Sequence, residues 1–353
     1  MGRRRISGDL TSEDNVARYE TALVVIVSKL YYLSQLKQEE IASRLKISRA
    51  LVSLILNEAK RMGIIEFKIN DPQEENKVVA GQLAQFFPDI SFVVVPTASK
   101  DEEVLREFVV SRAVEVINDQ LINQEIIGIS WGRTCYSIMS SFTARRMSPL
   151  SQIVPMVGGS NKNLPRFQLN ELVRNFAASM NAQPHFIHAP ALPYSQEDFD
   201  LFMQSSSMKQ ICQLWKNINV AILSVGPPPI TEEFDGSPVA EPFSERWVGA
   251  DKQLSLPVGN LSARYFDIEG HYVENDIQRR IIGIPFEYMK RIPKVIAIAA
   301  GMERVHSVVG ALRTGIVKTL VIDELTATAV VELLEKGRTY DLHEDVRRMY
   351  GIM

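Results

Sequence analysis

At 353 residues, with 46% hydrophobic and 23% charged residues, the chain has the size and composition of a soluble globular protein with two domains. No apolar run reaches the roughly 18 residues of a membrane-spanning helix, and Arg3, Arg4 and Arg5 are not followed by the apolar segment of a secretory signal. Because Cys135 and Cys212 are its only cysteines, no disulfide framework is expected, and we predict a cytoplasmic protein with no membrane partner.

The formal charge is distributed unevenly along the chain. Residues 1–70 contain 12 Lys and Arg against 8 Asp and Glu, a net charge of +4. The rest of the chain has 27 against 34, a net charge of −7. We therefore expect the N-terminal part to be the one that meets a polyanion such as DNA.

The segment QEEIASRLKISRALVSLILNEAKRMGII, which begins at Gln38, contains two helical patterns separated by a break at residues 46–48. Ser48 predicts the N-cap of the second helix. That helix has one apolar face formed by Val52, Ile55, Leu56 and Ala59. Its other face carries short or polar side chains, which suits a helix that lies in a major groove. We predict that DNA is contacted by Gln38, Ser48, Arg49, Ala50, Ser53, Asn57 and Lys60.

The elements on either side of this helix pair complete a recognisable unit. A third helix is predicted near residues 16–33, and the alternation in IIEFKIN predicts a strand over residues 65–70. Three helices with a strand ribbon form a winged helix-turn-helix, which binds DNA. The same pattern also fits a small helical domain that binds another protein.

The helix pair resembles the N-terminal domain of the SorC/DeoR-type sugar-responsive bacterial transcription regulators. Their pattern there is approximately T-Q-x-E-I-A-x-x-L-x-I-S-R-x-x-V-S-R-L-L-x-x-A-x-x-x-G-I-V. Lys37 stands where the family usually has a capping Thr or Ser, and Leu54 stands where it usually has Arg. The resemblance implies double-stranded operator DNA as a partner and a homo-oligomer, either a dimer or a tetramer.

The remainder of the chain alternates between short apolar runs and helical patterns. Strands are expected at residues 92–96, 125–130, 153–157, 185–189, 220–225, 295–300 and 319–323. Helices are expected near residues 101–118, 133–143, 168–180 and 196–217, and after each of the last two strands. This alternation predicts an α/β fold in which helices cover both faces of a parallel sheet. Residues 227–257 form an irregular insert.

Four loops follow strands and contain small residues: SWGRT at 130–134, GGSNKN at 158–163, GPPP at 226–229 and AGMER at 300–304. In parallel α/β sheets, ligands bind at the carboxyl ends of the strands, where helix N-termini favour anions. These loops therefore predict a pocket for an anionic ligand, with Ser130, Thr134, Ser160, Asn161, Lys162 and Arg304 among its residues.

The loops also resemble the effector domain of the same family, which has a Rossmann-like fold related to ribose-phosphate isomerase and glucosamine-phosphate deaminase. The resemblance covers residues 76–335 and implies a small-molecule effector, a phosphorylated sugar or related metabolite, and no cofactor. It implies that Gly158 and Gly159 form the family's G-G loop and that Asp267, in FDIEG, accepts hydrogen bonds from sugar hydroxyls. Arg304 takes a position that is usually Lys, and Met302 replaces a glycine.

Two other classes of function remain open at this point. The isomerase-like fold allows a sugar-phosphate isomerase or deaminase with an appended helix-turn-helix, in which Asp267 or Glu303 would be the base. Fold alone does not decide function, and we predict a binding protein with no catalytic residues. A protein-interaction adaptor would leave the clustered loops without a role.

Some side chains have structural interpretations that compete with functional ones. Cys135 is predicted to be a buried structural thiol, and Trp131 either stacks on a sugar or fills the core. His185 and His188, on an expected strand, would point to opposite faces, so no metal site is predicted.

We thus predict a transcription regulator of a carbohydrate-utilisation operon whose operator affinity depends on a sugar-type effector. The predicted organisation is a winged helix-turn-helix at 1–70, a linker at 71–77, an effector domain at 78–335 and a polar tail at 336–353.

Overall fold

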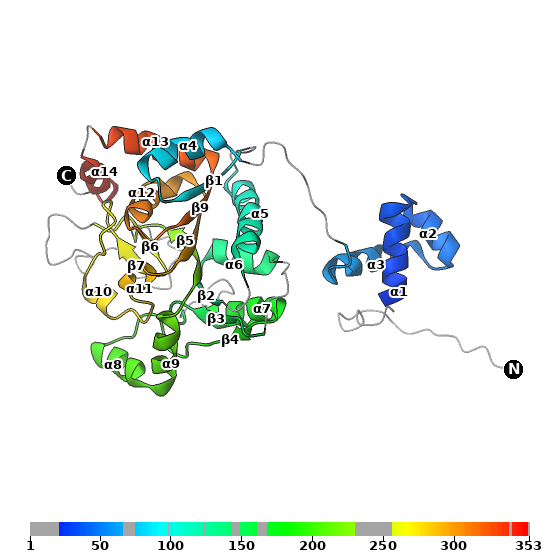
Figure 1. Cartoon of the computed structure of the whole chain (residues 1–353), viewed down its shortest axis with the longest axis horizontal. Helices are drawn as coiled ribbons and strands as arrows, with labels where there is room; N and C mark the ends of the chain where they lie inside the picture. Colours follow the sequence, from blue (N-terminus) through cyan, green and yellow to red (C-terminus); the bar gives the residue numbers. More distant parts are fainter. Residues whose placement is uncertain are drawn as a thin grey trace. The chain divides into compact units, whose positions relative to one another are not determined.

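The computed structural model describes residues 21–65, 75–97, 99, 101–122, 125–142, 149–160, 168–229, 256–338 and 341–351. The chain forms two compact units, Met1–Asp71 and Pro72–Met353. In Figure 1 the helices of the first unit are blue, and the second unit runs from cyan to red. Among the described residues, none of the helices is both long enough and apolar enough to cross a membrane.

The first unit is built from helices that share one small core. They are α1 (Thr21–Ser28), a π-helical turn (Lys29–Leu33), α2 (Gln38–Leu45) and α3 (Arg49–Arg61). Val27 of α1, Ile41 of α2 and Ile55 of α3 are fully buried against one another. Residues 66–70, which were predicted to form the strand of a wing, lie outside the described residues, as do residues 1–20.

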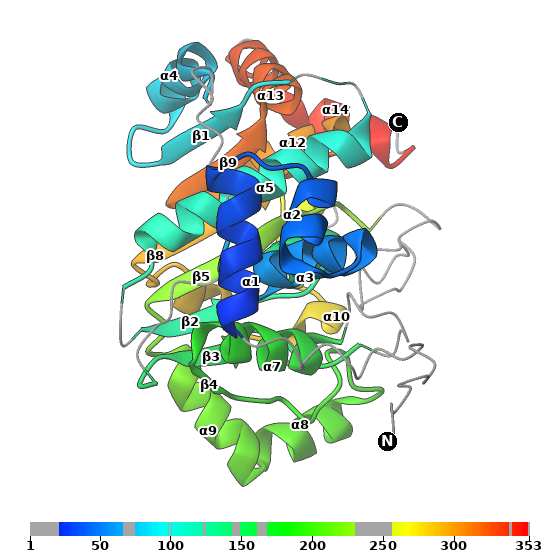
Figure 2. The ribbon, with the colours of Figure 1, turned by 90° about the vertical axis from the view of Figure 1, so that its right-hand side faces the viewer.

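The second unit contains a sheet whose main path is parallel throughout. The strand order, visible from top to bottom in Figure 2, is β1-β9-β8-β5-β2-β3-β4. A short antiparallel hairpin, β6 with β7, adds to the carboxyl end of β5. The strands are β1 (Ser91–Val95), β2 (Ile126–Ile129), β3 (Gln152–Pro155), β4 (Gln183–Pro184), β5 (Val220–Gly226), β6 (Gly259–Leu261), β7 (Arg264–Phe266), β8 (Lys294–Ala299) and β9 (Thr319–Asp323).

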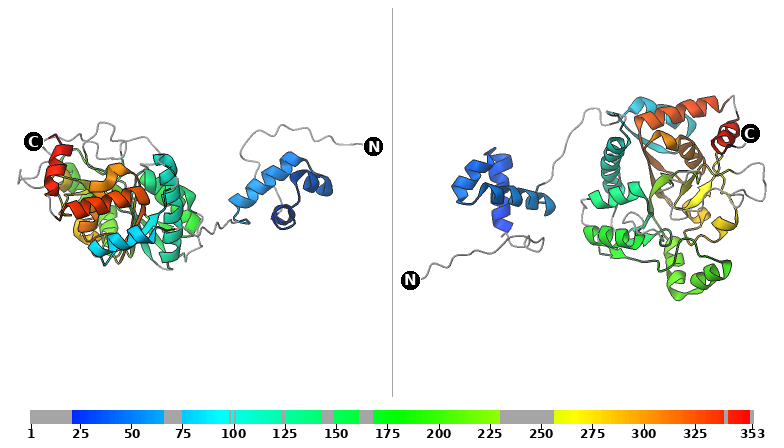
Figure 3. Two further views of the ribbon diagram at one scale, coloured as in Figure 1. Left: turned by 90° about the horizontal axis from the view of Figure 1, so that it is seen from above. Right: turned by 180° about the vertical axis from the view of Figure 1, so that it is seen from behind.

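Helices cover both faces of this sheet, which explains why most residues of its central strands are apolar. One face is covered by α5 (Glu102–Gln120), α6 (Arg133–Ser141) and α7 (Leu169–Met180). The other face is covered by α4 (Lys77–Phe86), α9 (Ser206–Trp215), α12 (Val305–Arg313) and α13 (Glu324–Lys336), as Figures 1 and 3 show. The predicted α/β fold with a parallel sheet is confirmed.

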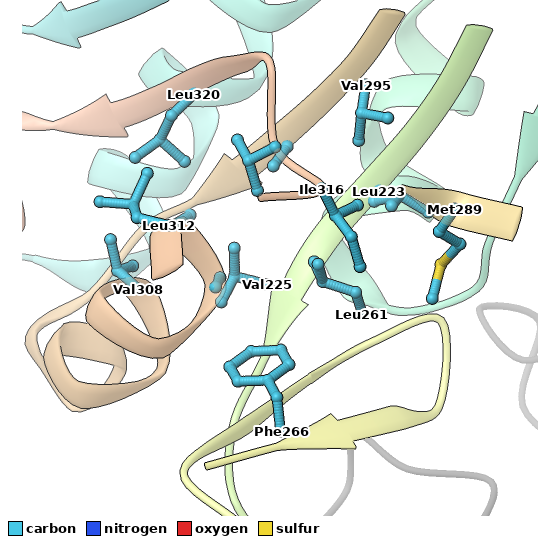
Figure 4. Close-up of a cluster of buried hydrophobic side chains, with 14 of the residues drawn as sticks. Leu223, Val225, Leu261, Phe266, Met289, Val295, Val308, Leu312, Ile316 and Leu320 are labelled. Atoms are coloured by element: carbon cyan, nitrogen blue, oxygen red, sulfur yellow. The ribbon is translucent and has the colours of Figure 1, made fainter. Parts of the chain in front are cut away.

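Several segments of the second unit pack into its core in a way that the sequence pattern did not reveal. Figure 4 shows Phe266 of β7 and Val225 of β5 in one buried cluster with Val308 of α12. The helical region predicted near residues 196–217 is divided into α8 (Gln196–Gln204) and α9, whereas α4, α10 (Asp276–Arg279) and α11 (Phe286–Met289) were not predicted from the sequence. Residues beyond 335, expected only as a polar tail, include α14 (Leu342–Met349), in which Leu342 and Val346 are buried. Two apolar residues on so short a helix are too few to produce a clear period.

One predicted strand was placed wrongly. Residues 185–189 are not a strand, because the fourth strand consists of Gln183 and Pro184 at the edge of the sheet. The proline offers no N–H to extend the ladder, although His185 still donates its N–H to Ile153 at 2.9 Å.

Candidate functional sites

The helix pair of the first unit is fixed by its caps and its core. The Ser48 hydroxyl accepts a hydrogen bond from the Leu51 N–H at 3.1 Å, so this predicted N-cap is confirmed. At the start of α2, the Lys37 side chain makes no cap, but Glu40 accepts from the Lys37 N–H at 2.8 Å. Glu40 thus supplies one half of a capping box, which offsets part of the loss from the missing Thr or Ser.

The predicted DNA-contacting residues share the accessible side of this pair. Ala50, Asn57 and Lys60 are exposed on α3, and Ser53 is half-buried. The guanidinium of Arg49, 68% exposed, forms an ion pair with Glu39 of α2 at 3.0 Å.

A hollow of about 480 Å³ connects the starts of the two helices. Gln38 and Arg49 both line it, together with Tyr31 and residues of the loop before α2. The structure therefore brings Gln38 and Arg49 to one surface. Leu54, 57% exposed, lies on the outer side of α3, where its apolar side chain contacts solvent and is not stabilised by burial.

In the second unit, the site begins where the direction of strand connection reverses. α6 follows β2 onto one face, whereas α12 follows β8 onto the other, and β5 lies between β2 and β8 in the sheet. Such a reversal leaves a crevice at the carboxyl ends of the strands. The loops that meet there are residues 130–133, 226–229 and 300–304.

Three guanidinium groups interact electrostatically at this edge, Arg106 of α5, Arg133 of α6 and Arg304, here called the arginine cluster. Burial lowers the pKa of Arg304 from its usual value, the adjacent Glu303 raises it, and the charges of Arg133 and Arg106 lower it again. Arg304 donates to the Val225 carbonyl at the end of β5 and lies 3.3 Å from Glu303.

Within the part of the chain that the structure describes, the arginine cluster has one paired carboxylate for three positive charges. Among the described residues, neither Arg106 nor Arg133 has an ion-pair partner, so Glu303 is the one carboxylate paired with the set. The N-terminus of α6 begins beside it at Arg133, and a helix N-terminus adds partial positive charge. Arg106 and Arg133 were absent from the predicted site. Arg133 lies within the SWGRT loop and could have been included, whereas no local signal identifies Arg106.

The other predicted residues of the SWGRT loop are buried near the start of α6. Ser130 and Thr134 are 2% and 7% exposed, and Trp131 packs into the sheet core rather than standing free. Burial raises the pKa of Cys135 to about 11, partly offset by a hydrogen bond from Ser224, so its thiol stays protonated at neutral pH.

The glycine loop after β3 uses its own amides inside the protein. Gly158 donates its N–H to Ile282 and Gly159 donates to Ala189, at 2.9 and 2.8 Å. A Cβ on Gly158 would stand 2.7 Å from the carbonyl oxygen of Pro190. These glycines therefore allow a close approach of backbones, and their N–H groups are not available to an anion. Ser160 follows them and is half-buried, while Asn161 and Lys162 lie outside the described residues.

Asp267 lies in a tight turn that occupies part of its carboxylate. Oδ1 accepts from the N–H groups of Glu269 and His271, each at 2.9 Å, and Oδ2 lies 3.5 Å from Nδ1 of His271. The turn packs on α12, because a Cβ on Gly310 would stand 2.7 Å from the Asp267 carbonyl oxygen. Gly310 follows Arg304 by six residues, about 9 Å along a helix. Asp267 thus contacts α12 at a position that follows Arg304 in the chain.

From the β6–β7 hairpin, Asn260 lies closest to the end of β5. Its Nδ2 donates to the Pro227 carbonyl at 3.1 Å and its Oδ1 accepts from the Ala263 N–H at 3.3 Å. A Cβ on Gly226 would stand 2.3 Å from Asn260 Nδ2. No motif around Asn260 distinguishes this asparagine in the sequence.

The histidines and acids of the described residues do not form a metal site. In this part of the chain, no group of three or more His, Cys, Asp or Glu side chains is placed to hold a metal ion. His185 bonds through Nε2 to Gln152 at 2.8 Å, and burial lowers its pKa, while His188 is exposed.

Comparison with known proteins adds to this geometry. A family model of sugar-binding domains, Sugar-bind, matches residues 71–332. The chain belongs to this family. The sorbitol operon regulator of Klebsiella pneumoniae is 28% identical over 316 residues, covering 88% of this chain and 98% of the relative. The deoxyribonucleoside regulator of Bacillus subtilis is 25% identical over 317 residues, covering 89% and 98%.

A crystal structure of the full-length sorbitol operon regulator SorC from Klebsiella pneumoniae superposes on this Sugar-bind protein with a TM-score of 0.68. It is 27% identical and covers 89% of this chain and 99% of that chain. The resemblance to the SorC/DeoR-type regulators is therefore confirmed. These relatives are regulators of transcription, not enzymes, and the chain is a sugar-binding regulator of the same kind.

Proposed function

We propose that Pro72–Met353 binds a phosphorylated sugar or polyol at the carboxyl ends of β2, β5 and β8. Binding sets the affinity of Met1–Asp71 for the operator of a carbohydrate-utilisation operon. The observation that supports the choice of a phosphorylated ligand is the arginine cluster.

A phosphate monoester fits this cluster for electrostatic reasons. Its charge at neutral pH is about −1.5 to −2. That charge offsets the excess of positive charge that Arg106, Arg133 and Arg304 leave beside Glu303 among the described residues. Planar guanidinium groups bind phosphate oxygens bidentately, as a Lys ammonium does not. A neutral sugar would leave these charges uncompensated.

The remaining site residues have different roles in this proposal. Ser130 and Thr134 shape the start of α6, and Ser160 closes the side formed by β3. Gly158 and Gly159 hold that loop close to residues 189–191 and do not donate to the ligand. Asn260 contacts the sugar hydroxyls, and Asp267 supports the hairpin that carries it.

For the first unit we propose a winged helix-turn-helix that reads DNA through α3. Gln38, Ser48, Arg49, Ala50, Ser53, Asn57 and Lys60 form its DNA surface. A single small head offers few contacts, so two heads on paired half-sites are the usual solution. We accordingly propose a cytoplasmic homodimer or homotetramer, which sedimentation at micromolar concentration would show.

A thermal-shift screen of the intact protein tests the ligand class. Each phosphorylated sugar or polyol is paired with its unphosphorylated parent at the same concentration. We expect only phosphorylated members to stabilise the second unit, by about 2.7 kcal/mol at 100 times the dissociation constant. Stabilisation by a parent sugar equal to that of its phosphate would contradict the proposal.

Two variants of equal charge change locate the site. Arg133→Ala removes an exposed member of the arginine cluster and should abolish the shift without lowering the unfolding temperature of the free protein. Lys209→Ala removes an exposed charge from α9 and should leave the shift unchanged. A DNA-binding titration with the stabilising compound then measures the regulatory effect, since tenfold in affinity corresponds to about 1.4 kcal/mol of coupling.

A further inference from the structure

Residues 75 and 76, where the chain enters the second unit, are here called the linker root. Several contacts hold them in place. The Asn76 N–H donates to the Val94 carbonyl at 2.8 Å, so the chain is attached beside β1. Asn76 Oδ1 caps α4 by accepting from the N–H groups of Val78 and Val79, each at 3.1 Å. One residue earlier, the Glu75 carboxylate pairs with Arg112 of α5 at 2.5 Å, with both side chains largely buried. These contacts fix residues 75 and 76, which join the predicted linker to the second unit.

Glu324, the first residue of α13, connects this root with the end of β1. Its Oε1 accepts from Nδ2 of Asn76 at 2.7 Å, and its Oε2 accepts from the Thr97 N–H at 3.0 Å. The Leu325 N–H returns a hydrogen bond to the Thr97 hydroxyl at 3.3 Å. Both oxygens of one half-buried carboxylate are therefore committed to residues near the linker root.

The neighbouring residue, Asp323, instead contacts the loop at residues 300–304. It is 1% exposed, and its Oδ2 accepts from the Gly301 N–H at 3.0 Å and from the Thr326 hydroxyl at 2.6 Å. Gly301, at φ +106°, begins the turn that leads to Glu303 and Arg304. Two consecutive carboxylates thus join the loop of the arginine cluster to the point where the predicted linker ends, at Asn76.

We propose that Asp323 and Glu324 are positioning residues that couple the loop at 301–304 to the linker root at Asn76. A movement of Arg304 toward a bound anion displaces Gly301 and, through the Gly301–Asp323 hydrogen bond, Asp323. Glu324, the next residue, passes this displacement to Asn76 and Thr97. The proposal rests on the proposed function for its driving force, because a ligand shifts an equilibrium only by its differential affinity for two states. The coupling itself is reciprocal, so perturbing the root must also change the loop.

Hydrogen exchange of the full-length chain measures this reciprocity without ligand or DNA. Asn76→Asp keeps the cap of α4, since Asp caps as well as Asn, but it places a second carboxylate against Glu324. We expect amide exchange to become faster by about tenfold at residues 301–305 as well as at 75–80. Faster exchange confined to residues 75–80 would overturn the proposal. Asn217→Asp, the same change at an exposed position in the turn after α9, should leave residues 301–305 unaltered.

A second substitution provides the rescue that a merely structural role does not predict. In the double variant Asn76→Asp with Glu324→Gln, the amide introduced at position 324 donates to the carboxylate introduced at 76 and still accepts from the Thr97 N–H. We expect exchange at residues 301–305 to return to within about twofold of the parent. A double variant as fast as Asn76→Asp alone would exclude the hydrogen-bonded junction. Because neither experiment uses a ligand or an operator, its failure would leave the proposed function standing, and failure of the sugar-phosphate screen would leave the coupling standing.

Discussion

The two units place their polar side chains in different ways. In Met1–Asp71, the residues expected to meet DNA belong to α2, α3 and the break between them, within residues 38–60. In Pro72–Met353, the arginine cluster is assembled from residues as far apart as Arg106 and Arg304, which separate helices and loops bring to one edge of the sheet.

This difference predicts how each unit responds to substitution. On α3, the core face and the outer face are separate, so a change on the outer face alters recognition and leaves packing intact. At the strand ends, the loops are held by hydrogen bonds to other loops, so a change in one loop strains its neighbours. The following predictions test that contrast, beginning with the largest expected effect.

Gly158→Ala should destabilise the second unit by about 3 kcal/mol, because the new Cβ would stand 2.7 and 2.8 Å from backbone oxygens of Pro190 and Ala189. Gly159→Ala is the matched control, since the nearest atom to its new Cβ is 3.6 Å away. Denaturant unfolding of the intact protein, followed by tryptophan fluorescence, measures both. Equal stability of the two variants would mean that the loop is not closely packed.

Arg49→Ala should weaken operator binding by about 1–3 kcal/mol if Arg49 reads a base and should leave the unfolding of both units unchanged. The operator is first selected from random duplexes with the parent protein. Loss of preference at one base pair indicates base reading, and a uniform loss with a smaller salt slope indicates a phosphate contact. Unchanged binding by a folded variant would remove Arg49 from the DNA surface.

Ser48→Ala should cost the first unit about 1 kcal/mol of stability through loss of the cap on α3, because the Leu51 N–H loses its partner. Ser53→Ala changes the same kind of residue on the outer face and should lower DNA affinity without lowering stability. Thermal unfolding with parallel DNA titrations separates the two effects. If both serines change stability equally, the cap formed by Ser48 contributes no more to stability than an exposed serine on α3.

The smallest expected effect is a pH dependence that arises at His306. Burial lowers the pKa of His306 from its usual 6.5, Asp345 opposes this, and Lys336 adds to it. The unfolded chain therefore takes up a proton at a higher pH than the folded chain, so the stabilisation is complete above pH 6.5 and is lost as the pH falls toward the lower folded value. Denaturation midpoints of the parent should decrease from pH 7 to 5.5, and those of His306→Gln should decrease less. Parallel slopes for the two proteins would assign the dependence to other groups.

Much of the local structure could be predicted because its cause is local. The apolar spacing of Val52, Ile55 and Ala59 places one face of α3 in the core, and a serine before the helix supplies its cap. In the second unit, apolar runs bounded by loops predicted six strands of the parallel sheet within about two residues. The predicted strand at 185–189 failed because an edge position and a proline decide pairing, and neither shows in an apolar run.

The amino-acid sequence by itself determined the α/β class, the helix pair and the loops that carry small and basic residues, since each depends on neighbours in the chain. Tertiary structure alone decided that Arg106 and Arg133 stand near Arg304, and that the amides of Gly158 and Gly159 are already bonded. It also decided that Asp267 is held in its own turn while Asn260 lies at the end of β5. The reason is physical: burial, hydrogen-bond partners and mutual charge are properties of pairs of residues far apart in the chain, and only the packed sheet determines which pairs meet.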